Sequence, residues 1–479
     1  MTELEHDAAV VNAGRVTGPI TVGDHGWPFG CPLFDLAERG YVMEEFFLEG
    51  DATTYRLAGE GRQTRDGHWD VESTGSFPFR TRFLVYRPAA AERFNGTVLV
   101  SWNNVTVGYE LFRGESAEIF EGGYVFVAAT VQHVGVHGFP TNSQGLVAWD
   151  PTRYATLSVP NDDVSYDIYA QIAMAVGPHR GATGVDPLGG LDVRRVISVG
   201  ASQSASRLAT FINGLHFRTH VFDAYLLQIY FGNPSPLQAG GAVVNINSAP
   251  AVAEGLTLGQ AIAAAGVAGS VLLRDDLDVP IMIVNSELEA VACYGVRQAD
   301  SDRMRTWEVA GASHTSLASV SARATKADRD FGARTPTDAR MNRIELEPVF
   351  DAALHHLNTW IDTGDAPPMQ PLIQFSGDPA DVLRDRLGIA VGGVRLPQVE
   401  APLGQNTAAP RASDIFSLLR GAYHPFDAAA IDALYPDEAE FVRQFNAAAQ
   451  RAEAAGVLLP RDVAPLIDEA TLEYRTVTR

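Results

Sequence analysis

Short apolar runs alternate with amphipathic stretches through the middle of this 479-residue chain. Six of these runs are too short for helices and mostly apolar, which is typical of strands buried on both faces of a sheet. They cover residues 97–102, 123–131, 193–200, 222–230, 279–286 and 305–310. Helical patterns at 109–120 and 163–176 separate some of them, the second with an apolar side chain at every fourth position. Strands that alternate with helices predict right-handed crossovers and a mostly parallel sheet.

The flanking regions extend this plan at both ends. Residues 1 to about 40 are punctuated by Gly and Pro and predict an irregular lead-in. Residues 41–57 and 77–86 alternate in polarity and predict two antiparallel edge strands. Together with the six apolar runs, they predict a sheet of about eight strands. A helix is expected over 345–363, followed by a proline-rich stretch over 364–412 and a mostly helical remainder.

The whole chain, residues 1–479, is expected to form a single domain with a core over about 40–365. The stretch 232–277 is rich in Gly, Ala, Ser and Pro, with a helical piece near 256–265. It is expected to cover a pocket as a cap or lid. Residues 366–479 are interpreted as an extension packed on the core. The clearest helices of this extension cover 426–430 and 437–455.

A candidate nucleophile, Ser202, lies where a predicted strand turns directly into a predicted helix. Its neighbours Gly200 and Ser204 are small, so the turn accepts a serine in a strained backbone conformation, as in a nucleophile elbow. The following helix directs its first N–H groups toward the serine, where negative charge develops in acyl transfer. Ser204 stands where this pattern usually has a second glycine, and an ordinary strand-to-helix turn is the alternative interpretation.

A nucleophilic serine needs a histidine base and an acid that holds the tautomer of the base. In α/β folds whose nucleophile lies on such an elbow, the three residues follow in the order Ser, Asp or Glu, His. Of the twelve histidines, only His314 follows the last predicted strand in a loop of small residues. Two carboxylates follow the run 279–286: Glu289 is the better candidate acid by its distance from the strand end, and Glu287 is the second. A solvated loop carboxylate is the alternative for either.

The oxyanion of an acyl-transfer intermediate needs two N–H donors in this architecture. One is expected from Gln203, the residue after the serine. The other is expected from the loop after the first crossover strand, at Asn103 or Asn104, and the sequence leaves the choice open. Trp102 and Tyr230, near the ends of two predicted strands, are expected to contact substrate, although Trp102 could simply cap the sheet.

Two other histidine pairs have the spacing of metal ligands. They are His133 with His137, and His216 with His220. Neither has an obvious third ligand nearby, and neither has the glutamate of a metalloprotease helix, so no metal is expected. The glycine pairs 240–241 and 392–393 match no phosphate loop or dinucleotide fingerprint. No cofactor is therefore expected.

Net charge, cysteine content and the lack of long apolar runs limit the binding partners and the cellular location that we expect. A formal net charge of −22 argues against a nucleic acid or an anionic membrane as partner. Only Cys31 and Cys293 occur, which excludes a disulfide framework and a cysteine zinc site but leaves one disulfide open. The first residues lack the apolar run of a secretory signal, and no run of about 18 apolar residues is present. A cytoplasmic location is expected.

Several motifs together resemble the bacterial "alpha/beta hydrolase domain" family of serine esterases. They are 200–208 with 213–216, 102–105, 286–289, 297–302, 307–314 and 392–397. The resemblance extends from about residue 15 to about residue 475. It implies an α/β-hydrolase fold and hydrolysis of carboxylic esters, and by position it implies roles for Ser202, Glu289 and His314. The family includes the Ser-Gln-Ser form of the elbow.

We therefore expect a serine hydrolase that cleaves a carboxylic ester of a small or medium-sized organic substrate through an acyl-enzyme. A lactonase, an amidase or an acyltransferase using the same triad is the alternative. A non-catalytic binding protein of the same fold is a further one. The sequence leaves the acyl and alcohol preference, and the oligomeric state, open.

Overall fold

The computed structural model describes residues 13–59, 63–181, 184–238, 271–332, 337–377, 382–408 and 415–478. The chain divides into two compact units, and each is described in turn. The first comprises the described residues up to 238 together with 271–281, and the second comprises the described residues from 282. Most of the expected cap, including its helical piece near 256–265, lies outside the described residues.

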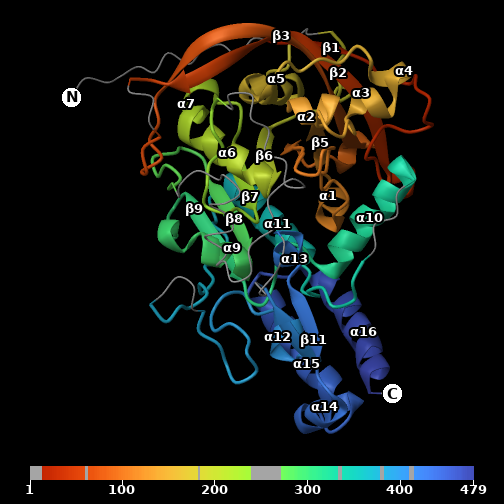
Figure 1. Cartoon of the computed structure of the whole chain (residues 1–479), viewed down its shortest axis with the longest axis vertical. Coiled ribbons are helices and arrows are strands. Elements are labelled where there is room, and N and C mark those ends of the chain that lie inside the picture. Colours follow the sequence, from red (N-terminus) through yellow and green to blue (C-terminus); the bar gives the residue numbers. More distant parts are fainter. Residues whose placement is uncertain are drawn as a thin grey trace. The chain divides into compact units, whose positions relative to one another are not determined.

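The strands of the first unit lie in the order β1-β2-β3-β5-β4-β6-β7. All of them except β4 are labelled in Figure 1. Their bounds are Arg15–Thr17 (β1), Tyr41–Leu57 (β2), Val71–Pro88 (β3), Thr97–Trp102 (β4), Val125–Ala129 (β5), Arg195–Ala201 (β6) and Ala224–Gln228 (β7). β1, β2, β3 and β5 pair antiparallel in succession, whereas β5, β4, β6 and β7 pair parallel. Every residue of β4 and β5 is buried, as expected for parallel strands covered on both faces. The three-residue edge strand β1 was not predicted.

The described part of the first unit also contains ten helical segments, some of which pack on this sheet. They are η1 (Leu36–Arg39), η2 (Ala91–Arg93), α1 (Ala117–Glu121), α2 (His133–His137), α3 (Leu146–Trp149), α4 (Pro151–Tyr154), η3 (Asp162–Val164), α5 (Ser165–Val176), α6 (Gln203–Gly214) and α7 (His216–Thr219). α5 packs against β2 and β4, and α6 packs against β6 and β7. α5 was predicted from its apolar spacing, and α6 as the helix that follows Ser202.

The predicted helix over 109–120 is wrong, because α1 begins only at Ala117. Ser116 caps that helix by accepting the N–H of Ile119 through its side chain. Upstream, Leu111 exchanges two backbone hydrogen bonds with Asn104, at 2.7 and 2.8 Å. The segment between β4 and α1 is therefore an extended loop that pairs with itself.

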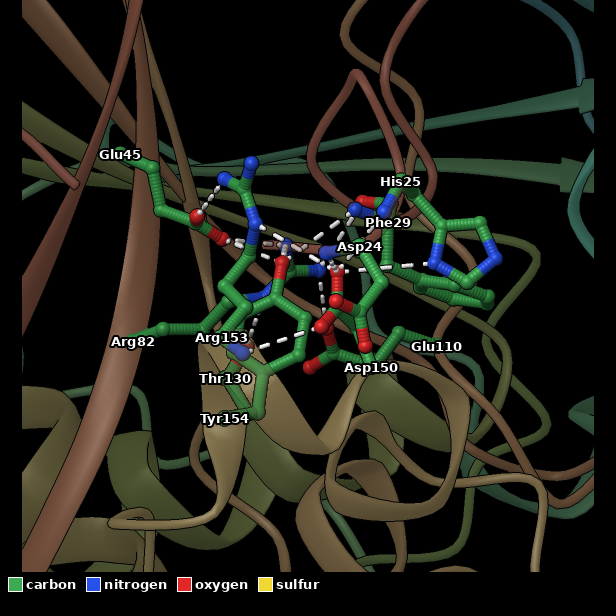
Figure 2. A network of polar contacts seen from close by, with 10 residues as sticks. All are labelled: Asp24, His25, Phe29, Glu45, Arg82, Glu110, Thr130, Asp150, Arg153 and Tyr154. Atoms are coloured by element: carbon green, nitrogen blue, oxygen red, sulfur yellow. Dashed lines mark hydrogen bonds and ion pairs between the residues drawn. The ribbon is translucent and has the colours of Figure 1, made fainter. Parts of the chain in front are cut away.

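The first unit contains a network of buried ion pairs and hydrogen bonds around Arg82 (Figure 2). Arg82 of β3 has no exposed side-chain surface and donates to Glu45 of β2 at 2.9 Å and to Glu110 at 2.6 Å. It also donates to the hydroxyl of Tyr154 at 3.2 Å. Glu45 receives a second cation, Arg153, at 2.7 Å. Buried charges of this kind persist only when they are paired and hydrogen-bonded.

The same network holds the irregular lead-in of the chain. Arg82 donates to the carbonyl of Phe29 at 3.1 Å. The Asp150 carboxylate accepts the backbone N–H groups of Asp24 and His25 at 2.9 and 3.2 Å. These donors outweigh the cost of burial and keep the pKa of Asp150 below its usual value. Side-chain charges, rather than a regular element, thus fix this part of the backbone.

The second unit contains β8 and β9, a small two-stranded sheet and most of the long helices. Its elements are β8 (Ile281–Ser286), α9 (Glu287–Ala292), η5 (Tyr294–Val296), β9 (Met304–Val309), α10 (Leu317–Phe331), α11 (Glu347–Thr363), α12 (Pro397–Glu400), β10 (Gly404–Thr407), α13 (Ile415–Arg420), β11 (Ala422–Pro425), α14 (Ala428–Leu434), α15 (Glu438–Ala454) and α16 (Pro460–Val477). α11, α14 and α15 lie where helices were predicted. Residues from α14, α15 and α16 share a hydrophobic core built around Tyr435, Phe441 and Tyr474.

Within the described ranges, none of the helices combines the length and the apolar character needed to cross a membrane.

Candidate active site

Ser202 lies alone between the last residue of β6 and the first residue of α6. Its backbone has φ 60° and ψ −119°, and it is one of three non-glycine residues with positive φ in the described part of the chain. Its N–H donates to the carbonyl of Gln228 in β7 at 3.0 Å, which helps to hold this costly conformation. A Cβ on Gly200 would lie 2.9 Å from Leu208, so the turn needs glycine there. The geometry is that of a sharp strand-to-helix turn with the serine at its tip.

The first N–H groups of α6 are oriented toward the serine. Gln203 is the first helical residue, and its N–H has no acceptor within the helix. The positive end of the helix dipole lies at the same place. This turn therefore provides both an N–H donor and a field that favour negative charge beside Ser202.

The two asparagines after β4 differ in what their donors do. The backbone N–H groups of Asn103 and Asn104 donate to the carbonyls of Ala129 and Leu111, at 3.2 and 2.8 Å. The Asn103 side chain donates to the Glu110 carboxylate at 3.1 Å. The donors of Asn103 are thus engaged in the interior, and its role in the oxyanion hole stays a prediction.

Asn104 approaches the elbow through its side chain. Its amide Nδ2 donates to the carbonyl of Ala201, the residue before the serine, at 3.1 Å. Its Oδ1 accepts the N–H and the hydroxyl of Thr106 at 2.9 and 2.7 Å, which fixes the orientation of the amide. An amide nitrogen carries two hydrogens, so the bond to Ala201 uses only one of the two N–H donors of Asn104.

Gln132, which the sequence reasoning missed, connects the two loops of this site. Its Oε1 accepts the indole N–H of Trp102 at 3.0 Å and the side-chain amide of Gln203 at 2.9 Å. Its Nε2 donates to Asp162 at 2.9 Å, and Asp162 pairs with Arg207 of α6 at 2.7 Å. The loop after β4 and the start of α6 are thus tied through one side chain.

Trp102 and Tyr230, expected to contact substrate, are both buried. The Trp102 side chain is 1% exposed, and its ring lies 4.7 and 5.5 Å from the rings of Tyr169 and Tyr166. Tyr230 is 4% exposed and follows Ile229, another residue with positive φ. The packing of Trp102 fits the alternative in which it caps the sheet. A substrate contact for either residue stays a prediction.

In the second unit, His314 and Glu289 form a direct pair. His314 follows β9, and its Nδ1 lies 2.7 Å from Oε1 of Glu289 in the first turn of α9. The other oxygen of Glu289 accepts the N–H and the hydroxyl of Ser286 at 3.2 and 2.5 Å. An ionised carboxylate only accepts, so the proton of the neutral ring lies on Nδ1 and the lone pair on Nε2. This is the tautomer that a general base needs.

Glu287, the second candidate acid, bonds to other partners than His314. Its Oε2 accepts the N–H of Gly311 at 2.8 Å, and its Oε1 accepts from Arg384 at 2.7 Å. The side chain is 1% exposed. Glu287 therefore shapes the loop that carries His314, while Glu289 contacts the ring itself.

The remaining candidates have structural partners. His133 Nδ1 lies 2.6 Å from the carbonyl of Val159, and His137 Nε2 accepts the N–H of the same residue at 3.3 Å. Both cysteines are buried free thiols, and burial raises the pKa of Cys293. Neither cysteine therefore offers a reactive thiol at the surface.

The chain belongs to the alpha/beta hydrolase domain family, because the family model of that description matches residues 16–468. This match confirms the predicted fold class. No protein with a curated description matches the chain.

Among solved structures, the chain is similar to esterase Est22, with 13% identity over 56% of this chain and 71% of that one, and a TM-score of 0.29. It is also similar to brefeldin A esterase, described as a bacterial homologue of human hormone-sensitive lipase. That match has 13% identity over 54% and 68% of the two chains, and a TM-score of 0.24. Esterase B from Lactobacillus rhamnosis, inhibited by a tributyrin phosphonate, matches at 13% identity over 54% and 74%, with a TM-score of 0.25.

Proposed function

We propose that this protein is a serine hydrolase that cleaves a carboxylic ester of a small or medium-sized organic substrate. Ser202 is the nucleophile, His314 the base and Glu289 the acid that orients it. The observation that carries the proposal is the backbone of Ser202, held at positive φ between β6 and α6. A strained non-glycine conformation persists where the surrounding structure enforces it, and such residues cluster at active sites. Membership of the alpha/beta hydrolase domain family supports the same assignment.

In the proposed reaction, Nε2 of His314 takes the proton of the Ser202 hydroxyl as its oxygen attacks the ester carbonyl. Glu289 stabilises the imidazolium that forms. The tetrahedral intermediate collapses, His314 gives its proton to the departing alkoxide, and an acyl-enzyme on Ser202 remains. Water then attacks the acyl group, again with His314 as base, and releases the carboxylic acid. The 2.7 Å contact of Nδ1 with Glu289 supports this assignment of roles.

Two donors stabilise the oxyanion in this proposal. They are the backbone N–H of Gln203 and the second side-chain N–H of Asn104. Support comes from the position of Gln203 at the start of α6 and from the hydrogen bond between Asn104 and the Ala201 carbonyl. Of the two asparagines expected from the sequence, the proposal uses Asn104, because the donors of Asn103 already have partners in the interior.

The test is Ser202→Ala, compared with Ser206→Ala on a panel of p-nitrophenyl esters of increasing acyl length. Ser206 lies one turn further along α6 and is half-buried, so its variant controls for the loss of a hydroxyl in this helix. We expect the Ser202 variant to lose at least about 1000-fold in kcat and to resist labelling by a fluorophosphonate, because no nucleophile remains. Wild-type activity in Ser202→Ala would refute the proposal.

The same residues would also serve a lactonase, an amidase or an acyltransferase, since the leaving group and the acceptor alone differ. Product analysis with lactone, amide and ester substrates, and with alcohol added to the water, separates these reactions. Wild-type protein that neither turns over any of them nor reacts with the fluorophosphonate would instead be a non-catalytic binding protein.

A further inference from the structure

Three potential metal ligands of the first unit converge at the end of α7. His216 is the first residue of that helix, His220 caps its end, and Asp278 lies before β8. One ligand atom from each lies within 4.8 Å of the other two. Nε2 of His216 is 2.8 Å from Oδ1 of Asp278. The sequence showed the two histidines but not the third residue, which follows His216 by 62 positions.

The left-handed backbone conformation of His220 brings its side chain close to His216. His220 has φ 45° and ψ 38°, a left-handed conformation that non-glycine residues rarely adopt. Its N–H donates to the carbonyl of His216 at 2.8 Å and closes the helix. The two imidazole rings lie with their centroids 5.4 Å apart. The tight turn thus brings a histidine, rather than the usual glycine, back over the ring of His216.

The ring nitrogen of His216 that faces away from Asp278 has a buried hydrogen-bond partner. Nδ1 of His216 lies 2.9 Å from the hydroxyl of Tyr225, a fully buried residue of β7. Burial lowers the pKa of His216, which favours the neutral ring that metals bind. Without metal, the Tyr225 hydroxyl donates to Nδ1 of His216, and Nε2–H of His216 donates to the Asp278 carboxylate. With a cation at Nε2, that proton is displaced and the Tyr225 hydroxyl rotates to accept from Nδ1–H, as an outer-shell partner does.

Access and charge suit a cation. The His216 side chain is 1% exposed, whereas that of Asp278 is 61% exposed and His220 lies at the surface, so an ion can enter from solvent. The nearby Arg274 is already paired with both oxygens of Asp276, at 2.6 and 2.9 Å. Its charge therefore opposes a bound cation only weakly.

We propose that His216, His220 and Asp278 form a binding site for a divalent transition metal ion, with Zn²⁺ the ion best matched to two imidazoles and one carboxylate. Three protein ligands leave a fourth, tetrahedral position for water. The site differs from the proposed catalytic centre and does not depend on it. Ser202 precedes α6 and His216 follows it, and a twelve-residue helix spans about 18 Å.

The consequence of this site is a cross-link between distant parts of the chain. It joins the end of the α6–α7 helix pair to the segment that leads into β8. A ligand that binds only the folded state stabilises it by mass action. We therefore expect Zn²⁺ to raise the melting temperature of the protein rather than to take part in ester cleavage.

The experiment uses tag-free, full-length protein stripped with a chelator and then equilibrated with Zn²⁺ by dialysis, with bound metal measured by atomic absorption. We expect one equivalent per chain. His220→Ala and Asp278→Asn, both at exposed positions, are expected to weaken binding at least about 100-fold, the upper end of what loss of an outer-shell partner costs. Tyr225→Phe is expected to weaken it about 10-fold.

The matched control is His68→Ala. His68 is an exposed histidine that lies 2.8 Å from one carboxylate, Asp275, and 3.4 Å from another, Asp276. Among the residues that the structure describes, it does not belong to a group of three potential metal ligands. This variant should bind Zn²⁺ and gain thermal stability as wild type does, while His220→Ala should show no gain. Wild-type protein that retains no stoichiometric Zn²⁺, or unchanged binding in both ligand variants, would overturn the proposal.

Discussion

Replacing Arg82 with methionine is expected to destabilise the first unit severely, because it removes a cation from between two buried carboxylates. The side chains of Glu45 and Glu110 are each 1% exposed. After the change, Glu45 keeps Arg153 at 2.7 Å and the hydroxyl of Tyr154 at 2.7 Å. Glu110 loses its 2.6 Å bond to Arg82 and keeps the Asn103 amide at 3.1 Å. The cost therefore falls mainly on Glu110.

Removal of one partner from a buried ion pair costs about 3–5 kcal/mol, because the other charge stays buried without compensation. We expect Arg82→Met to lower the free energy of unfolding by about this amount. Adding Glu110→Gln should recover part of it, because the neutral amide can still accept from Asn103 and no bare charge remains. The two changes should thus be non-additive, as expected for residues in contact.

The control lies two residues away on the same strand. Arg80 pairs with Glu49 at 2.5 Å, but these side chains are 32% and 31% exposed. Arg80→Met should cost only about 0–1 kcal/mol, since solvent screens such a pair. Urea denaturation, followed by tryptophan fluorescence and by circular dichroism, measures all four proteins. Equal losses in Arg80→Met and Arg82→Met, or a double variant less stable than Arg82→Met, would show that buried charge does not dominate here.

Three further predictions concern the proposed chemistry and the pH dependence of folding. Glu289→Gln should lower kcat about 10⁴-fold with little change in KM, because the amide can donate to His314 and favour the wrong tautomer; an unaltered kcat would exclude Glu289 as the acid. Gln132→Met should lower kcat about 10–100-fold and leave KM nearly unchanged, because it removes the hydrogen bond that holds the Gln203 side chain. A change in KM alone would argue against a positioning role for Gln132. Burial raises the pKa of Asp223, so the folded state holds this proton more tightly than the unfolded state. The free energy of unfolding of wild type, relative to that of Asp223→Asn, should therefore rise as the pH falls from about 7 to about 4.5. Urea denaturation midpoints of the two proteins, measured at each pH, test this, and an unchanged difference between them would contradict it.

The sequence predicted those elements whose signal is local. β2 and β4 begin and end at the predicted residues, because alternation and a short apolar run are read within one strand. The strand–Ser202–helix turn was equally local, since small residues and the switch from strand to helix pattern lie side by side. Glu289 was chosen because an acid is expected a few residues beyond a strand end. Its carboxylate contacts His314, and its role as the acid stays a prediction.

The features that the sequence did not predict depend on partners far away in the chain. The stretch from residue 109 has apolar spacing that suits a helix. Glu110, however, accepts a hydrogen bond from Arg82, which lies 28 positions earlier in the chain. A carboxylate with a buried guanidinium partner stabilises the extended path more than a few helical residues would. No local window contains that information. Asp278, 62 positions after His216, was missed as a third ligand for the same reason.

Gln132 is a different case, because a signal for it was present. The carboxyl ends of parallel strands meet at one edge of a sheet, and ligands bind there in open α/β folds. Asn104 follows β4, Ser202 follows β6, and Gln132 follows β5 at the same edge. Polar residues just beyond each buried strand should therefore be grouped before any are assigned to loops. Such a grouping places Gln132 beside the elbow without coordinates, since β5 and β6 both neighbour β4. It would leave Arg82 and Asp278 unassigned, because neither follows a strand at that edge.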